Sequence, residues 1–252
     1  MYKKIINFLH KLKLNNLDKN QIIIDFKKLD GQEKTTKKRF SLNKNDFYLC
    51  LNDKTINTIF DAHYIYHPAW AARIIKKTNP KLHIDISSTL HFCSILSAFQ
   101  KVKFYDYRPA NLILDNLETD SADLTNLPFN DNSVQSLSCM HTIEHIGLGR
   151  YGDNIDYDGD LKAIKELKRV LAYEGNLLFV VPIGKPKIMF NAHRIYAYAQ
   201  IIEYFKGFNL EEFALIPDNA IKNGIIYNAT EEECNLQTYG CGCFWFKKEI
   251  NK

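Results

Sequence analysis

The chain has 252 residues, of which 46% are hydrophobic and 25% are charged. This length allows one sizeable core with a small appendage. The 33 basic and 29 acidic residues are spread along the chain, without the focused positive field of a nucleic-acid-binding protein, so we expect no nucleic-acid partner.

Residues 1–14, MYKKIINFLHKLKL, predict a short amphipathic helix. Its apolar run is broken by His10 and Lys11, too early for a secretory signal peptide. Such a helix packs on its own protein or on a subunit partner, which leaves a homodimer open, and its basic face can also contact anionic lipid. No apolar run reaches the roughly 20 residues of a membrane span. The six cysteines are irregularly spaced, so we expect a cytoplasmic protein without disulfides or a transmembrane segment.

Two β-rich runs follow, at residues 21–26 and 46–51, and they predict a small two-stranded appendage. Apolar residues at helical spacing predict a helix over residues 60–77. We therefore expect an N-terminal helix with a small α/β extension over residues 1–59. The main domain is expected over residues 60–252.

From residue 81 onward, strands and helices alternate. The expected strands are 82–86, 102–107, 133–140, 176–183, 208–216 and 241–248, and the expected helices are 92–99 and 161–172. Strands this apolar, interleaved with amphipathic helices, predict an α/β fold with a doubly wound, mostly parallel sheet covered on both faces.

Two aspartates stand where such a sheet binds its ligands. In doubly wound sheets the ligand lies beyond the carboxyl ends of the strands. Asp85 and Asp106 each come near the end of an expected strand, about 20 residues apart, a spacing at which the second acid can bind ribose hydroxyls. The pattern therefore predicts a ligand with a ribose diol.

Residues 121–146, SADLTNLPFNDNSVQSLSCMHTIEHI, resemble the third and fourth elements of class I S-adenosylmethionine-dependent methyltransferases. Residues 167–182 are similar to the family's Arg-Val-Leu-Lys-Pro-Gly-Gly turn and fifth strand, with Gly175 as the one glycine kept. Residues 193–213 resemble its late helix and Gly-Phe turn. The resemblance spans about residues 80–248. It implies a seven-stranded Rossmann-like sheet, with S-adenosyl-L-methionine as cofactor and S-adenosyl-L-homocysteine as product.

The resemblance also implies which residues contact the cofactor. It assigns Asp123 to the adenine amino group and the backbone of Leu124 to the edge of the ring. The expected cofactor-binding residues are Asp85, Ser87, Ser88, Asp106, Tyr107, Asp123, Leu124 and Met140.

The family's first motif, Asp-x-Gly-x-Gly-x-Gly, has lost its glycines here. When Asp85 is aligned with the aspartate of this motif, the three glycine positions are occupied by Ser87, Thr89 and His91. Glycine there tolerates a positive φ, and a Cβ costs on the order of 1–2 kcal/mol. S-adenosylmethionine has no phosphate, so hydroxyls can meet its amino-acid tail, and one of them can cap the next helix. The change counts more against an NAD-dependent oxidoreductase than against a methyltransferase, and it leaves a non-catalytic relative open.

Methyl transfer requires the protein to position the acceptor and, for a hydroxyl, to remove its proton. The candidate bases are His141 and His145, near the end of the fourth strand, with His193 as a third. Glu144 can orient a neighbouring histidine or favour a helix N-terminus electrostatically. Methylation of nucleic acid is disfavoured, because residues 140–144 read Met-His-Thr-Ile-Glu and not Asn-Pro-Pro-Tyr.

The loop at residues 183–196 is basic and contains no acid, which favours an anionic acceptor. A solvated basic loop is the alternative interpretation. The expected acceptor-binding residues are Tyr64, His67, Arg150, Lys185, His193 and Arg194.

Two motifs resemble metal sites, and we expect a metal at neither. Residues 154–160, NIDYDGD, begin like a calcium loop, but its twelfth position is Lys165 rather than a glutamate. Cys241, Cys243 and Cys234 lack a convincing fourth ligand for zinc.

Four segments look like a little-characterised bacterial branch of the superfamily, of unknown function and often found among surface-polysaccharide genes. They are HYIYHPAW (63–70), YDYRPANL (105–112), EHIGLGRYGD (144–153) and FNAHRIY (190–196). The resemblance implies O-methylation of a polar, anionic small molecule, such as a nucleotide sugar or another precursor in capsule polysaccharide biosynthesis. The alternatives are N-methylation, another phosphorylated acceptor, a non-catalytic protein of glycan assembly, and an NAD-dependent oxidoreductase.

Overall fold

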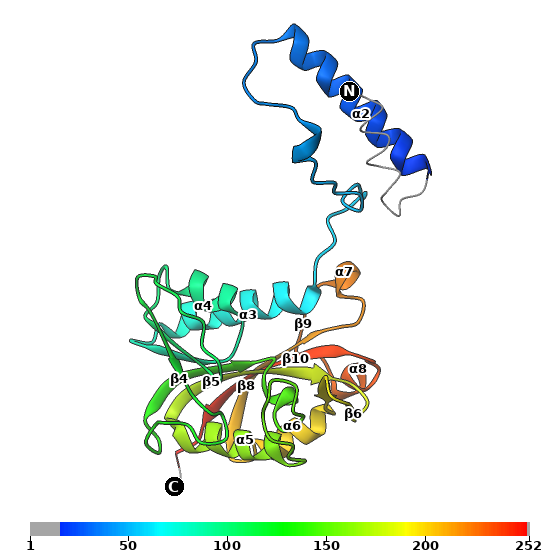
Figure 1. Ribbon diagram of the computed structural model, residues 1–252. Helices are drawn as coiled ribbons and strands as arrows, with labels where there is room; N and C mark the ends of the chain where they lie inside the picture. Colours follow the sequence, from blue (N-terminus) through cyan, green and yellow to red (C-terminus); the bar gives the residue numbers. More distant parts are fainter. Residues whose placement is uncertain (1–15, 251–252) are drawn as a thin grey trace. The chain divides into compact units, whose positions relative to one another are not determined.

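The computed structural model describes residues 16–250 (Figure 1). The chain divides into two compact units, Met1–Ile59 and Phe60–Lys252. The amphipathic helix expected over residues 1–14 lies outside the described residues. Among the described helices, none combines the length and the apolar character that a membrane crossing requires.

The first unit is helical where a β appendage was expected. Helix α2 covers Asn16–Thr35, and a short 3-10 helix, η1, covers Lys44–Asp46. The predicted strands are wrong: residues 21–26 lie inside α2, and residues 46–51 form no strand.

Packing explains this difference. Phe26 is buried, and Ile22 and Ile23 pack in the same cluster with Leu42, Phe47 and Leu49. The rings of Phe26 and Phe47 lie 5.0 Å apart. In a helix, Ile22 and Ile23 share a face with Phe26, whereas in a strand Ile23 would point away from it. This packing outweighs the β propensity of three consecutive isoleucines.

The second unit is built on an eight-stranded sheet in the order β3-β2-β1-β4-β5-β10-β8-β9. The strands are β1 (His83–Ile86), β2 (Val102–Asp106), β3 (Leu117–Ser121), β4 (Val134–Met140), β5 (Leu171–Ile183), β8 (Phe208–Ile216), β9 (Ile226–Tyr227) and β10 (Gly240–Lys248). The strands from β3 to β5 are parallel, and β10 runs antiparallel to both β5 and β8. This order confirms the expected α/β, Rossmann-like fold of the class I methyltransferase type, with the two-residue edge strand β9 added to the seven strands expected.

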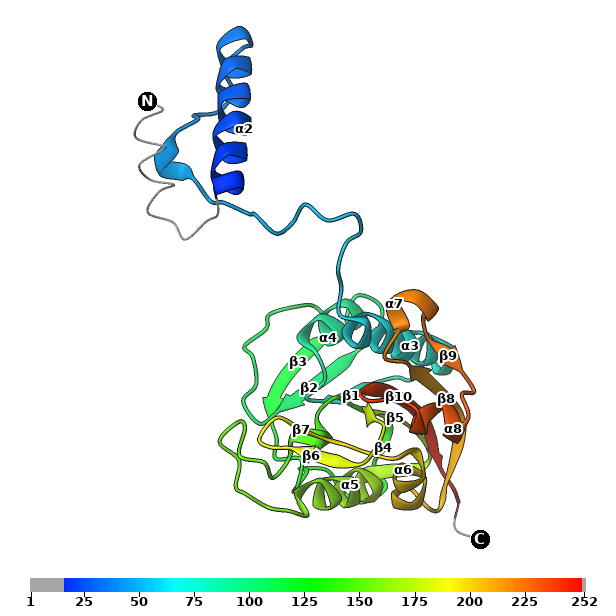
Figure 2. The same ribbon diagram turned by 90° about the vertical axis from the view of Figure 1, so that its right-hand side faces the viewer.

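Helices cover both faces of the sheet (Figures 1 and 2). One face packs against α3 (Ala62–Thr78), α4 (Leu90–Leu96) and α7 (Ala220–Asn223). The other packs against α5 (Gly159–Val170), α6 (Tyr198–Tyr204) and α8 (Glu231–Asn235). A 3-10 turn, η2 (Ile143–His145), follows β4, and a hairpin of β6 (Lys187–Met189) and β7 (His193–Ile195) follows β5.

Helix α3 directs two histidines into the protein. It begins after the N-cap Asp61, whose carboxylate accepts a hydrogen bond from the backbone N–H of Tyr64, and it ends at Asn79 in the left-handed region, φ 46°. His63 and His67 are four residues apart, so they lie on the same face of α3, and both are buried. This face therefore places two imidazoles in the interior.

Candidate functional site

Two adjoining cavities lie at the carboxyl ends of the parallel strands. The first has a volume of about 410 Å³ and is lined by residues that follow β1, β2, β3 and β4 and by the loop before α5. The second, of about 450 Å³, is lined by residues from α3, the end of β4, the β6–β7 hairpin and Tyr239, which directly precedes β10. Both fall within the range of about 300–1,000 Å³ that small-molecule sites occupy. Ser87, His141, His145 and Tyr151 line both cavities.

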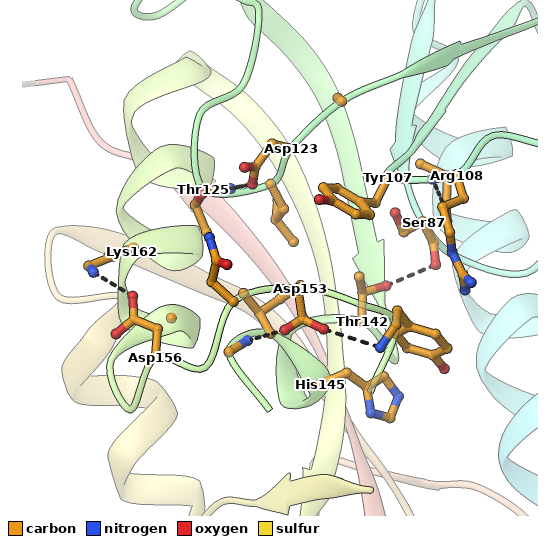
Figure 3. A pocket seen from close by; sticks show the side chains of 18 of the residues that line it. Ser87, Tyr107, Arg108, Asp123, Thr125, Thr142, His145, Asp153, Asp156 and Lys162 are labelled. Atoms are coloured by element: carbon orange, nitrogen blue, oxygen red, sulfur yellow. Dashed lines mark hydrogen bonds and ion pairs between the residues drawn. The ribbon is translucent and has the colours of Figure 1, made fainter. Parts of the chain in front are cut away.

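Two aspartates contribute carboxylates to the first cavity. Oδ1 of Asp106, at the end of β2, accepts a hydrogen bond from the backbone N–H of Arg108 at 2.8 Å, which leaves the second oxygen available to a ligand. Oδ1 of Asp123, after β3, accepts from the backbone N–H of Thr125 at 2.8 Å and from its hydroxyl at 2.7 Å. In Figure 3, Arg108 and Asp123 lie on different sides of the cavity.

The loop between η2 and α5 closes the first cavity from the opposite side (Figure 3). Asp153 accepts hydrogen bonds from the backbone N–H groups of Gly147 at 2.8 Å and Tyr151 at 3.2 Å. Burial raises the pKa of Asp153, but the backbone hydrogen bonds lower it by more than burial raises it, so the net shift is downward. Gly147 has φ 81°, and a Cβ there would collide with the backbone carbonyl of Asp156. The loop therefore depends on glycine at this position and on an ionised carboxylate.

Two of the three acids in the calcium-like stretch at residues 154–160 contact other side chains of the protein. Asp156 pairs with Lys162 (Figure 3). Asp160 is buried and accepts a hydrogen bond from the hydroxyl of Tyr196 at 2.9 Å. These contacts hold the start of α5 against the first cavity.

The turn after β1 contains hydroxyls where the motif Asp-x-Gly-x-Gly-x-Gly has glycines. Ser87, at the first glycine position, has φ 55°, in the left-handed region. Its N–H donates to the carbonyl of Tyr105 at 2.7 Å, and the hydroxyl of Thr142 donates to the carbonyl of Ser87 at 2.9 Å. Thr89 accepts from the backbone N–H of Phe92 at 3.2 Å, which confirms that one of these hydroxyls caps the following helix.

A buried polar network supports this turn from below. Asp85 accepts hydrogen bonds from the backbone N–H of Ser88 at 3.0 Å and from the hydroxyl of Ser138. The ring nitrogens of His83 lie 2.8 Å from the hydroxyl oxygen of Ser136 and 2.9 Å from that of Ser138. Burial raises the pKa of Asp85 to about 6 and lowers the pKa of His83 to about 3. The network fixes the end of β1, and its side chains His83, Asp85, Ser136 and Ser138 line neither cavity.

Two histidines with different surroundings follow β4. Nδ1 of His141 lies 2.8 Å from Oε1 of Glu144, so Nδ1 carries the proton and donates it, and both side chains are almost fully buried. Burial raises the pKa of Glu144, but the imidazoles of His141 and His145 lower it, and the net shift is downward. Nδ1 of His145 lies 2.6 Å from the carbonyl oxygen of Ala192, so Nδ1 carries a proton and donates it, and in the neutral imidazole Nε2 then has the lone pair. Arg150 donates to the same carbonyl at 3.1 Å.

The structure brings most of the predicted site residues to the two cavities. Those that line one or both are Tyr64, Ser87, Ser88, Asp106, Tyr107, Asp123, Leu124, Met140, His141, Glu144, His145, Arg150 and His193. Asp85 and His67 are buried beside the cavities, and Lys185 is exposed outside them. Arg194 is also buried, where it donates to the carbonyl of Ile146 at 2.6 Å and lines a third cavity of about 260 Å³.

Sequence reasoning missed several lining residues. Among them are Arg108, Thr142, Tyr151, Asp153 and Tyr239. The run of glycines before Asp153 was a signal for a tight, ligand-facing loop. No local pattern marks Tyr239, because it reaches the site through the antiparallel pairing of β10 with β5.

Two comparisons of sequence match parts of the chain. Residues 126–222 match the family described as Caenorhabditis protein of unknown function, DUF268. An uncharacterised protein of Methanocaldococcus jannaschii is 27% identical over 104 residues, which cover 40% of this chain and 39% of that relative. The match thus spans less than half of either protein.

Solved structures share the fold. The N-methyltransferase NodS of Bradyrhizobium japonicum WM9, in complex with S-adenosylhomocysteine, superposes with a TM-score of 0.51 at 11% identity, over 73% of this chain and 86% of its own. The 1,6-didemethyltoxoflavin-N1-methyltransferase of Burkholderia thailandensis, with bound 1,6-didemethyltoxoflavin and S-adenosylhomocysteine, gives a TM-score of 0.50 at 9% identity, over 73% and 79%. At these identities the likeness establishes the fold.

Proposed function

We propose that the protein is an S-adenosylmethionine-dependent methyltransferase that methylates a hydroxyl of a polar, anionic small molecule. The observation that carries the proposal is the junction of the two cavities, where Ser87, His141, His145 and Tyr151 line both. Methyl transfer is an in-line displacement and needs the cofactor and the acceptor side by side. One cavity for each, joined at the ends of β1 and β4, meets this requirement.

The first cavity has the groups that an adenosine ligand needs. In the proposal, the available oxygen of Asp106 accepts from a ribose hydroxyl, and Asp123 with the backbone of Leu124 binds the adenine edge. Ser87 faces the same cavity, and Ser88 fixes the end of β4, because its hydroxyl oxygen accepts from the backbone N–H of Met140 at 3.2 Å. The sulfonium end of the cofactor would lie near this junction.

His145 is better placed than His141 to remove the proton of the acceptor. The side chain of His145 is 12% exposed and that of His141 is 2% exposed. In the neutral imidazole, Nε2 of His145 has the lone pair, and it lies 3.9 Å from the carboxylate of Glu144, which stabilises the imidazolium formed when the proton is taken. Glu144 and His141 then act as positioning residues.

Arg150 supports an anionic acceptor. It is exposed, lines the second cavity, and its guanidinium lies 5.0 Å from the ring of Tyr151. His193 lines the same cavity. A guanidinium binds phosphate and carboxylate groups strongly, so a nucleotide sugar or another phosphorylated acceptor, such as a capsule precursor, suits this cavity.

Calorimetry with S-adenosylhomocysteine and with NADH tests the cofactor assignment. We expect saturable binding of S-adenosylhomocysteine and none of NADH. Incubation with methyl-labelled S-adenosylmethionine and a panel of nucleotide sugars then tests the reaction, and we expect label in at least one sugar. Absence of S-adenosylhomocysteine binding would overturn the proposal. Binding without transfer to any phosphorylated or sugar acceptor would instead favour a non-catalytic relative.

A further inference from the structure

Three buried side chains from distant parts of the sequence meet beside the second cavity. They are His63 on α3, His141 after β4 and Cys241 on β10. One ligand atom of each, a ring nitrogen or the Sγ, lies within 4.8 Å of the other two. Among the described residues, this is the group of three whose atoms are arranged for a metal ion.

Two of the surrounding histidines have one ring nitrogen fixed by a protein oxygen. Nδ1 of His141 donates to Glu144 at 2.8 Å, and Nδ1 of His67 donates to the carbonyl of His63 at 2.6 Å. In the neutral imidazole, the second nitrogen of each of these two rings has the lone pair. Nε2 of His141 and Nε2 of His67 are buried without a hydrogen-bond partner.

This arrangement is typical of histidines that bind metals. A metal-binding imidazole almost always donates its other N–H to a carboxylate or a backbone carbonyl, which fixes the tautomer and directs the lone pair to the ion. A buried polar atom without a partner is unusual in folded proteins, and an ion would supply the missing partner. Nε2 of His141 belongs to the group of three and Nε2 of His67 to a neighbouring ring, and packing alone is a poor explanation for both.

We propose that His63, His141 and Cys241 bind a divalent zinc-class ion, with Nε2 of His67 as the fourth ligand. Imidazole and thiolate are the ligands that Zn²⁺ prefers. Bond lengths of about 2.0–2.3 Å place the ligand atoms of a tetrahedral ion roughly 3.3–3.8 Å apart, so His63, His141 and Cys241 close by about 1 Å on binding. His67 lies outside this group of three, so its ring moves further to reach the ion. The Cys241 thiol releases its proton to solvent, and the imidazoles bind as neutral donors.

The local charge suits such an ion. One thiolate and neutral imidazoles leave a site with a net charge of +1, and the buried carboxylate of Glu144 lies behind His141 to balance it. The ring of His67 lies 5.1 Å from that of His141, one helical turn beyond His63. Four protein ligands make a closed, structural site that joins α3 to the sheet. The inference does not depend on methyl transfer.

Metal content and affinity test the inference. The full chain is treated with EDTA, reconstituted with Zn²⁺, freed of excess ion by gel filtration, and analysed by mass spectrometry for bound metal. We expect one ion per chain. With Co²⁺ as a probe, we expect the visible bands of a four-coordinate site and a thiolate charge-transfer band. In Cys241→Ser the charge-transfer band should be lost and the affinity should fall at least 100-fold.

Cys234→Ser is the matched control, because Cys234 is equally buried but belongs to the core on the other face of the sheet. It should bind the ion as the unmodified protein does. His63→Gln gives a second test should Cys241→Ser fail to fold. Substoichiometric metal in the unmodified protein, or equal affinity in Cys241→Ser and Cys234→Ser, would overturn the inference. Unchanged affinity in His67→Gln would remove His67 from the ligand set.

Calorimetry with S-adenosylhomocysteine on the same samples keeps this inference separate from the proposed function. An ion bound without S-adenosylhomocysteine binding would support the metal site and overturn the methyltransferase proposal. S-adenosylhomocysteine binding by a protein that takes up no ion would support the methyltransferase proposal and overturn the metal site.

Discussion

The hydroxyl of Thr142 donates a hydrogen bond to the backbone carbonyl of Ser87 at 2.9 Å, which joins the turn after β1 to the end of β4. Ser87 and His141, which precedes Thr142, each have φ 55°. A non-glycine residue in this left-handed region costs about 1–2 kcal/mol, and such strained residues are frequent at ligand-binding sites. The hydrogen bond thus holds two strained turns together where the cavities meet.

The strain at Ser87 gives a prediction for stability. We expect Ser87→Gly to be more stable than Ser87→Ala by about 1 kcal/mol, because glycine adopts φ 55° without a Cβ clash and both variants lose the hydroxyl. The free energy of unfolding in urea measures this difference. Ser94, inside α4, is the control, and there alanine should be the more stable by about 1 kcal/mol. An alanine at position 87 as stable as glycine would contradict the prediction.

The carboxylate of Asp106 gives a prediction for cofactor affinity. Asp106→Ala should weaken S-adenosylhomocysteine binding by about 10- to 100-fold, the effect of losing a charge-assisted hydrogen bond of about 1.5–3 kcal/mol. Calorimetry measures the dissociation constant. Asp115→Ala removes an exposed carboxylate that lines neither cavity, and it should bind like the unmodified protein. Equal dissociation constants for the two variants would exclude Asp106 from the site.

Much of the fold could be predicted because the central strands are continuous apolar runs. Residues 208–216 were predicted as a strand and form β8, and β10 covers the predicted run 241–248 with one residue more. Strand β3 reads LETDS, and its exposed, polar positions hide it from a hydrophobicity pattern. Residues 21–26 misled the prediction, because three isoleucines in a row favour a strand locally, whereas the contact of Phe26 with Phe47 favours a helix.

The candidate site was predictable where it follows strand ends, and less so where it depends on tertiary pairing. Asp106 and Asp123 follow strands, so topology alone places them at the cavity. Lys185 and Arg194 were predicted to bind the acceptor because their loop is basic, but the sequence does not show which of its side chains face the cavity. Arg194 instead donates hydrogen bonds to backbone carbonyls. The approach of His63 to Cys241 requires α3 and β10 to pack together, which no spacing in the sequence reveals.

The buried imidazole of His83 gives a prediction for pH dependence. Burial lowers its pKa from 6.5 to about 3 in the folded protein, so between these values the unfolded state binds more protons and stability falls as the pH falls. Asp85 acts in the opposite sense, because its raised pKa makes the folded state bind the extra proton. His83→Gln removes the positive contribution of His83 and leaves the opposing contribution of Asp85, so the slope of unfolding free energy against pH should become more negative by up to about 1.4 kcal/mol per unit between pH ~4 and ~6.

Urea unfolding at several pH values, with EDTA present to remove any bound ion, measures this slope. His91→Gln is the control, because His91 is exposed on α4 and hydrated in both states, and it should leave the slope unchanged. A slope in His83→Gln equal to that of the unmodified protein would show that His83 does not titrate differently on folding.

The lone pair of His145 gives a prediction for catalysis that separates a base from a positioning residue. His145→Asn keeps a side-chain N–H that can donate to the carbonyl of Ala192 but has no group to accept the proton of the acceptor. We expect single-turnover transfer of a labelled methyl group to the best nucleotide sugar of the panel to slow by about 10²–10⁴-fold, with S-adenosylhomocysteine affinity unchanged. His91→Asn should have neither effect. A slower rate accompanied by an equal loss of S-adenosylhomocysteine affinity would mean that His145 shapes the cavity, and an unchanged rate would leave the acceptor proton to another group or to solvent.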